Sequence, residues 1–149
     1  MKTSFFLSKA SSVRRMMGFL VIICAAMLVA CTSATQLEIE VAAAAADCPM
    51  VLDNGFTITN IDTEDNNVVY ECVMDESESD VLLSDMDVLE VRAELKEELL
   101  ESIRTEKLYD DDIKDMVKLC KDANYNIIFR LIGSHSGYKM DIVLYSYEL

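Results

Sequence analysis

Cys31 is the cysteine whose surroundings point most clearly to a chemical modification. It ends the run Leu28–Cys31, and before it lie the twelve apolar residues Phe19–Ala30 and a basic leader. An export signal needs an apolar core of about 7 to 15 residues, whereas a membrane-spanning helix needs roughly 20, so this leader predicts export. The small Ala30 and the aliphatic Leu28 favour cleavage just before Cys31, with its thiol as the group that carries the lipid.

The Leu28–Cys31 run resembles the lipidation signal of bacterial lipoproteins. The resemblance implies acyl chains of the palmitate type on Cys31. Two or more chains anchor a protein stably, because each buried methylene contributes about 0.8 kcal/mol. The protein would then be exported and held at the cell membrane or the outer membrane, facing the periplasm or the exterior. The alternative is an ordinary secretory cleavage, after Ala34 or after Ala46.

Cleavage before Cys31 changes the charge of the chain. It removes four of the 13 basic residues and none of the 27 acidic ones, which leaves nine basic and 27 acidic residues and a formal net charge of −18. Such a surface repels nucleic-acid phosphates and anionic headgroups, so no nucleic-acid partner is expected. A basic envelope protein or loosely held cations would suit the charge, although solubility alone explains it more simply.

Three further cysteines, Cys48, Cys72 and Cys120, remain in the mature chain. They form no Cys-x-x-Cys pair, so neither a thioredoxin-like redox site nor a zinc knuckle is predicted. Cys72 and Cys120 each fall on the apolar face of a predicted element, which makes a disulfide between them sterically reasonable in an oxidising compartment. The rival pairing is Cys48 with Cys72, and the alternative to both is buried thiols.

No catalytic residue, metal site or cofactor is predicted. His135 lies between two serines in a predicted turn, where adjacent side chains seldom point at each other and no partner carboxylate is implied. The acidic run 62–67 lacks the glycine and the distal glutamate of an EF-hand loop. Asp110–Asp112 suits the acidic first turn of a helix. The protein is therefore not expected to be an enzyme.

The 119 residues from Cys31 onward suffice for one domain, expected over residues 47–149, with residues 31–46 as a tether or spacer. Ala42–Ala46 is low in complexity, as in a spacer. Leu37, Ile39 and Val41 alternate with glutamates, however, so whether residues 37–41 form an extra strand on the domain edge stays open.

Alternating apolar residues predict two β-hairpins. The first joins Phe56–Ile61 to Val68–Met74 through the polar run 62–67, with Val68, Tyr70, Cys72 and Met74 on one face. The second joins Asn126–Ile132 to Tyr138–Tyr147 through the turn Gly133–Gly137, and it has Met140, Ile142 and Leu144 on one face.

Apolar spacings of three and four predict two helices between the hairpins. The longer runs from about Asp85 to Thr105, with Ser84 in a capping box, and the shorter begins near Asp110 with Met116 and Cys120 on its apolar face. Glutamates on the longer helix could form an acidic docking face, although a solvated surface is the simpler interpretation. These glutamates are Glu90, Glu94, Glu97 and Glu101.

The order of hairpin, two helices and hairpin predicts an α+β fold, with an antiparallel sheet of about four strands and both helices on one face. Several short pieces resemble small uncharacterised secreted lipoproteins of gut anaerobes. They are Cys48–Met50, Asn54–Gly55, Asn67–Tyr70, Leu119–Cys120 and Glu148–Leu149. The resemblance spans residues 48–149 and implies fold and location, with no functional residue to transfer.

The expected function is that of a lipid-anchored cell-envelope protein that acts through protein contacts, in a non-enzymatic accessory role. The alternative is an envelope module that binds a small ligand or a cation. A concave pocket would favour the second class and a flat acidic face the first.

Overall fold

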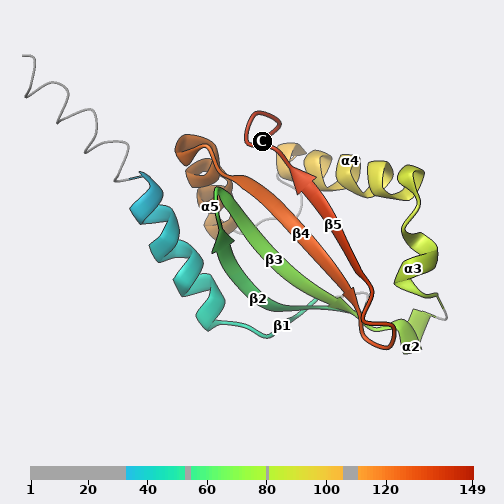
Figure 1. Cartoon of the computed structure of the whole chain (residues 1–149). Coiled ribbons are helices and arrows are strands. Elements are labelled where there is room, and N and C mark those ends of the chain that lie inside the picture. Colours follow the sequence, from blue (N-terminus) through green and yellow to red (C-terminus); the bar gives the residue numbers. More distant parts are fainter. Residues whose placement is uncertain (1–32, 53–54, 80, 106–110) are drawn as a thin grey trace, which may run out of the picture.

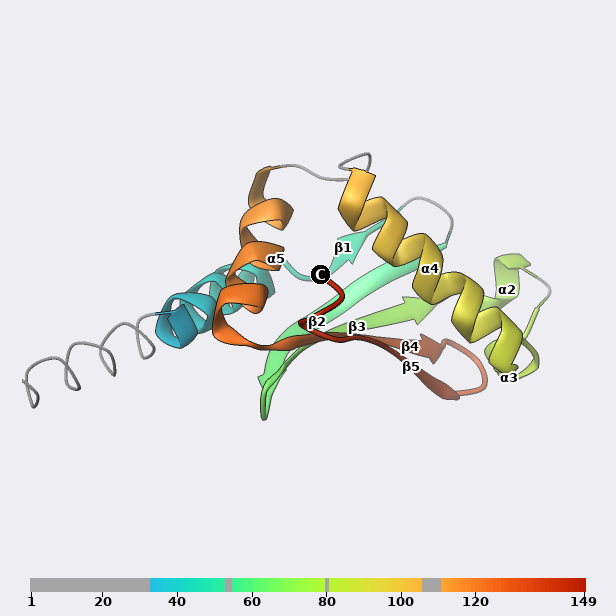
Figure 2. The ribbon, with the colours of Figure 1, turned by 90° about the horizontal axis from the view of Figure 1, so that it is seen from above.

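The computed structural model describes residues 33–52, 55–79, 81–105 and 111–149 (Figure 1). A five-stranded sheet of order β1-β2-β3-β4-β5 carries the helices on one of its faces (Figure 2). The strands are β1 Met50–Val51, β2 Phe56–Glu64, β3 Asn67–Met74, β4 Asn126–Gly133 and β5 Lys139–Leu144. The helices are α2 Glu76–Ser79, α3 Leu83–Met86, α4 Leu89–Thr105 and α5 Asp111–Ala123, preceded by a helix over residues 33–46. None of the helices so described is long and apolar enough to cross a membrane.

The α+β class and both predicted hairpins are confirmed. β2 pairs antiparallel with β3, and β4 pairs antiparallel with β5. The predicted apolar faces are buried under the helices, with Val68 and Met140 completely inaccessible. The first turn is tighter than the predicted run 62–67, because both strands extend into it and Asp65 alone takes a left-handed backbone, with φ 52°.

The sheet is mixed, which corrects the prediction of an antiparallel sheet of about four strands. β3 and β4 are parallel, from Asn67↔Asn126 to Met74↔Gly133, and β1 adds a fifth strand. The reason is that only α4 returns along the sheet. Its 17 residues span about 25 Å, close to the ~26 Å of an eight-residue strand. Because α2 and α3 are single turns at one end and α5 lies at the other, the chain crosses once and enters β4 parallel to β3 (Figure 2).

The segment predicted as a tether, or as an extra strand at residues 37–41, is a helix over its described residues 33–46. Leu37 and Val41, four residues apart, are 0% and 4% exposed, whereas Ile39 is 58% exposed. The run of alanines that follows has the highest helix propensity of any residue type. The apolar spacing of four therefore overrides the spacing of two, and this helix contributes to the core.

The longer predicted helix is interrupted. α3 ends at Met86 and α4 begins at Leu89, with Asp87 in a non-helical conformation. The predicted capping box is wrong, because Ser84 lies inside α3 and the N-cap residue is Leu82. The apolar face of α5 is confirmed, with Met116 and Cys120 buried. The side chain of Asp112, and Asp110 altogether, lie outside what the structure describes.

Candidate functional site: an apolar groove beneath α4

A groove of about 300 Å³ lies between α4 and the helix-covered face of the sheet. Its floor includes Ile58, Cys72 and Leu131 from three neighbouring strands, and its walls include Leu95 and Leu99 of α4. Of the described side chains that line it, only Glu98 and Ser102 are polar. The remaining lining residues are Leu52, Phe56, Met74, Leu83, Met86, Phe129 and Ile142.

The groove exists because the helices cover the sheet unevenly. α4 packs along β5, at one edge, while α5 and the helix of residues 33–46 cover the other end (Figure 2). The inner face of β2 beneath α4 is left without a close cover. Phe56, Ile58, Leu95 and Leu99 are consequently only partly buried, although they pack against the core.

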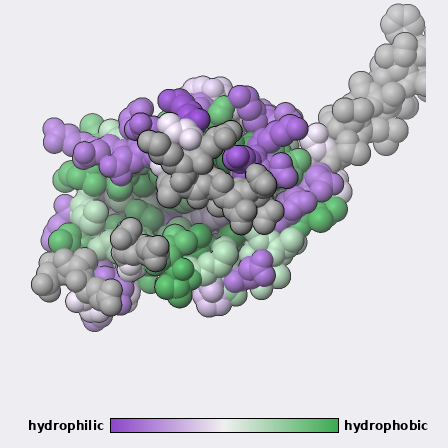
Figure 3. All heavy atoms as spheres, turned by 180° about the vertical axis from the view of Figure 1, so that it is seen from behind, coloured by the Kyte–Doolittle hydropathy of each residue, from purple (hydrophilic) through white to green (hydrophobic). Residues whose placement is uncertain are grey.

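Exposed apolar side chains continue the groove outward. Leu52 lines it at 44% exposure. Leu82, next to the groove residue Leu83, is 45% exposed. Figure 3 shows hydrophobic side chains gathered on this helix-bearing face, below the hydrophilic side chains of α4. Contiguous exposed apolar surface of this kind marks interaction sites.

The glutamates of α4 give the groove an acidic edge. Glu98 lines the groove itself, and Glu98, Glu101, Ser102 and Thr105 line a second hollow beside it. The predicted docking residues Glu90, Glu94, Glu97 and Glu101 are all exposed on α4. Two basic residues of this helix form ion pairs with acidic residues of the same chain: Arg92 pairs with Asp87, and Lys96 lies 2.8 Å from Glu148. α4 thus combines an apolar underside with an acidic outer edge.

Glu76 fixes the end of the groove nearest α3. It is 5% exposed, and its carboxylate accepts hydrogen bonds from the backbone N–H groups of Leu83, His135 and Ser136 at 2.8–2.9 Å and from the hydroxyl of Ser136 at 2.8 Å. These bonds, that from Leu83 foremost, lower the pKa of Glu76 to about 2. Glu76 therefore ties the β4–β5 turn to α3. The acidic run around Glu76 in the sequence offered no signal for this role.

The structure brings Ser134 and His135 closer than expected, with 3.3 Å between Ser134 Oγ and His135 Nδ1. Ser134 Oγ also accepts the backbone N–H of Glu76, at 3.1 Å. The Glu76 carboxylate receives the backbone N–H of His135 and not a ring nitrogen. These contacts hold the turn together and do not form a nucleophile, base and orienting carboxylate in series.

The three described cysteines are free thiols, so neither predicted disulfide is formed in this structure and the pairing stays a prediction. Burial raises the pKa of Cys72 to about 11 and that of Cys120 to about 12. Burial and the charge of Asp47 raise the pKa of Cys48. Within the described residues no group of three or more His, Cys, Asp or Glu side chains is placed to hold a metal ion. Cys31 lies outside those residues.

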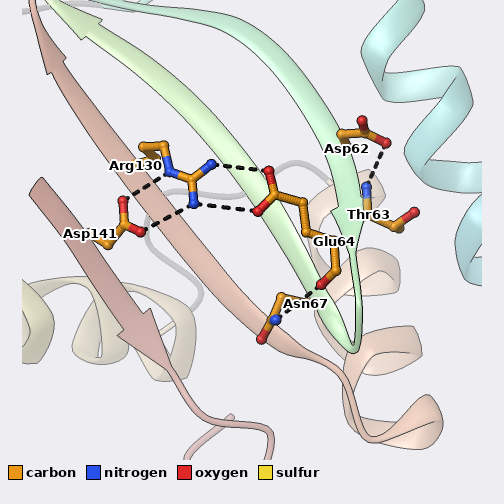
Figure 4. A network of polar contacts seen from close by, with 6 residues as sticks. All are labelled: Asp62, Thr63, Glu64, Asn67, Arg130 and Asp141. Carbon is orange, nitrogen blue, oxygen red and sulfur yellow. Dashed lines mark hydrogen bonds and ion pairs between the residues drawn. The ribbon is translucent and has the colours of Figure 1, made fainter. Parts of the chain in front are cut away.

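The opposite face of the sheet carries a polar network that the sequence did not reveal (Figure 4). The Arg130 guanidinium donates to Asp141 at 3.1 and 3.2 Å and to Glu64 at 3.0 and 3.4 Å. These bonds, those to Asp141 foremost, raise the pKa of Arg130. Because the three side chains come from β4, β5 and β2, the network links these strands on the face of the sheet opposite the helices.

The fold is similar to those of several solved bacterial proteins. The type 2 secretion system pilotin of Vibrio vulnificus matches with a TM-score of 0.50 at 12% identity, covering 78% of this chain and 94% of the pilotin. The type II secretion system pilotin of Vibrio cholerae matches at 0.50 and 11%, covering 80% and 97%. A protein of Pseudomonas aeruginosa regarded as secreted matches at 0.52 and 9%, covering 78% and 92%. At these identities the likeness shows the fold alone.

No protein-family model and no curated protein matches the chain. The resemblance to lipoproteins of gut anaerobes therefore stays a prediction.

Proposed function

We propose that the protein is an exported, lipid-anchored, non-enzymatic accessory protein of the cell envelope, which holds an amphipathic segment of a partner protein in the groove beneath α4. The groove is the observation that supports the proposal most strongly: it is about 300 Å³ in volume, and its lining among the described residues is apolar except for Glu98 and Ser102. Grooves of this kind accept a helix through apolar side chains spaced by three and four residues.

The negative charge at the edge of the groove indicates which kind of partner segment would bind there. Glu98 and Glu101 stand where the flank of a bound segment would lie. Lysine or arginine beside the apolar positions of the partner would meet these carboxylates, and the negative charge of the domain would speed the encounter. The expected segment is therefore apolar on one side and basic on the other.

The structural neighbours support the accessory role. Two of them are pilotins of type 2 secretion systems, so this fold occurs in proteins of a secretion system. We extend that role to this chain. The structural similarity does not identify its partner. A small apolar molecule is the competing occupant, because 300 Å³ lies at the lower end of ligand pockets.

The groove is tested by matched substitutions on α4. Leu99→Glu places a carboxylate in the groove lining, whereas Leu89→Glu places one on a side chain that is 86% exposed and outside the lining. The two variants and the unaltered protein are crosslinked in intact envelopes and recovered. We expect Leu99→Glu to lose the crosslinked partner and Leu89→Glu to keep it, because an unpaired charge in an apolar site opposes binding.

Thermal unfolding of each variant, followed by circular dichroism, shows whether Leu99→Glu remains folded. Ser102→Arg serves as a second groove variant, since it fills space and places a basic group where a basic partner is expected. Retention of the same partner by both groove variants would contradict the proposal. Loss of an extractable small molecule, with no protein adduct in the unaltered chain, would favour the competing occupant.

The anchor is tested separately with Cys31→Ser, with Cys48→Ser as the matched control. Membrane fractionation should show Cys31→Ser released and Cys48→Ser retained, because two or more acyl chains supply the attachment. Membrane-bound Cys31→Ser would overturn the lipidation proposal.

A further inference from the structure

We infer that the anchor holds the domain in one orientation, with the start of the helix of residues 33–46 and the C-terminal end of α5 against the lipid headgroups and the groove toward the aqueous side. The inference rests on the proposed lipidation of Cys31. The domain would then not turn freely on a flexible tether, because the fold determines which end of it faces the membrane.

The chain between the lipid and the domain is short. A single residue, Thr32, separates Cys31 from residue 33, where the described helix begins. Two residue steps reach at most about 7 Å. A flexible tether of residues 31–46 would instead span about 22 Å on average, enough for any face to turn to the membrane.

The helix of residues 33–46 is held firmly by the domain. Leu37 is 0% and Val41 4% exposed, and both belong to the main core cluster. The partly buried Ala44 and Ala45 pack against the same cluster. A helix with its apolar side built into the core transmits the position of its first residue to the whole domain.

The fold determines which surface lies beside the anchor. In both views the start of this helix lies next to the C-terminal end of α5, whereas α2, α3 and the β4–β5 turn lie at the opposite end (Figures 1 and 2). β4 runs between the two ends and its eight residues span about 26 Å. Met74, Leu83 and Met86 line the groove and lie in the half of the domain that is farther from the anchor. The groove would therefore face away from the membrane.

The charges at the anchored end suit a headgroup surface better than those of α4. No acidic residue occurs between Cys31 and Glu38, and the N-terminus of a helix carries partial positive charge. Residues 116–124, the last part of α5 and the residue after it, hold Lys118, Lys121 and one aspartate. Both lysines are exposed, and Lys121 Nζ donates a hydrogen bond to the carbonyl oxygen of Leu149 at 2.8 Å. Basic side chains near a bilayer are attracted to anionic lipids. The five glutamates of α4 lie on another part of the surface.

The test measures how close two labelled positions lie to the bilayer. The full lipidated protein is purified from membranes and reconstituted into vesicles of phosphatidylcholine with phosphatidylglycerol, some carrying a headgroup nitroxide. A fluorophore is attached through an unnatural amino acid at Asp122 or at His135, both exposed side chains at opposite ends of the domain. We expect nitroxide lipids to quench the label at 122 and to leave the label at 135 unchanged.

A linker variant gives the matched control. Ten Gly and Ser residues inserted between Thr32 and Ser33 add about 17 Å of flexible chain and leave the domain unaltered. The insertion should abolish the quenching at 122 while the protein stays on the vesicles. Equal quenching at 122 and 135, or quenching at 122 that survives the insertion, would overturn the inference. Failure of the unaltered protein to stay on vesicles would instead refute lipidation.

Discussion

Removing one buried leucine from the N-terminal helix distinguishes a docked helix from a tether. Leu37 is 0% exposed in the core, so Leu37→Ala loses the transfer free energy of the deleted groups and leaves a cavity. Such substitutions cost about 2–5 kcal/mol. We expect about 3 kcal/mol, because the helix lies at the periphery of the domain, where neighbours can partly close the cavity.

The matched control is Ile39→Ala. Ile39 lies two residues away in the same helix but is 58% exposed, so its truncation should change the free energy of unfolding by no more than about 0.5 kcal/mol. Both variants are compared in urea on the chain that begins at residue 31 and carries Cys31→Ser. With a slope of about 2 kcal/mol per molar urea, Leu37→Ala should lower the midpoint by about 1.5 M. Equal and small shifts for both variants would refute the docked helix.

Three further outcomes follow from the buried polar groups, the glycines and the thiols. The pKa of Glu76, about 2 in the folded chain, lies below its ordinary 4.5, so its contribution to stability is complete above pH 4.5 and is lost as pH falls towards 2. Glu76→Gln should therefore lower the unfolding temperature at pH 7 and converge with the unaltered protein near pH 2, whereas the exposed Glu97→Gln should change little at either pH; a constant difference would contradict this. Gly133→Ala should destabilise more than Gly137→Ala in urea titrations, because its Cβ would overlap the Glu76 carboxylate, which backbone N–H groups hold in place, while the Cβ at residue 137 has no described atom within 4 Å and costs only about 1–2 kcal/mol for its φ of 62°. At pH 8, mass spectrometry after alkylation should find Cys72 and Cys120 modified only on unfolding and Cys48 sooner, because burial raises the pKa of the first two to about 11 and 12; rapid modification of all three would argue against this packing.

The parts of the fold that sequence patterns predicted are those set by neighbouring residues. The strand pairs around Asp65 and around Gly133–Gly137 follow from alternation and turn residues that lie within about twenty positions of each other. The apolar face of α5 follows in the same way from the spacing of Met116 and Cys120. In these places local preference and packing agree.

The parts that were missed depend on contacts between distant segments. The parallel pairing of β3 with β4 depends on how many times the helices cross the sheet, which periodicity does not report. At residues 33–46 two periodicities compete, and the burial of Leu37 by the rest of the domain decides between them. Glu76 becomes a buried acceptor only because the turn at His135 and Ser136 folds over it.

The groove was missed for a related reason. Leu95 and Leu99 share the apolar spacing of three and four that predicts the longer helix, and such spacing by itself indicates burial. Their partial exposure results from α4 packing along β5 and leaving the inner face of β2 open. No local pattern in the chain reports that displacement.

The most direct test of the proposed function is the identity of what crosslinks inside the groove. A photoreactive amino acid is placed at Ser102, which lines the groove, or at Lys139, which is exposed on the opposite face of the sheet. Mass spectrometry of the adducts formed in intact cells should find at residue 102 a peptide of one partner protein, with apolar residues spaced by three and four and basic residues beside them, and should not find it at residue 139. The same adducts at both positions, or none at residue 102, would contradict the account.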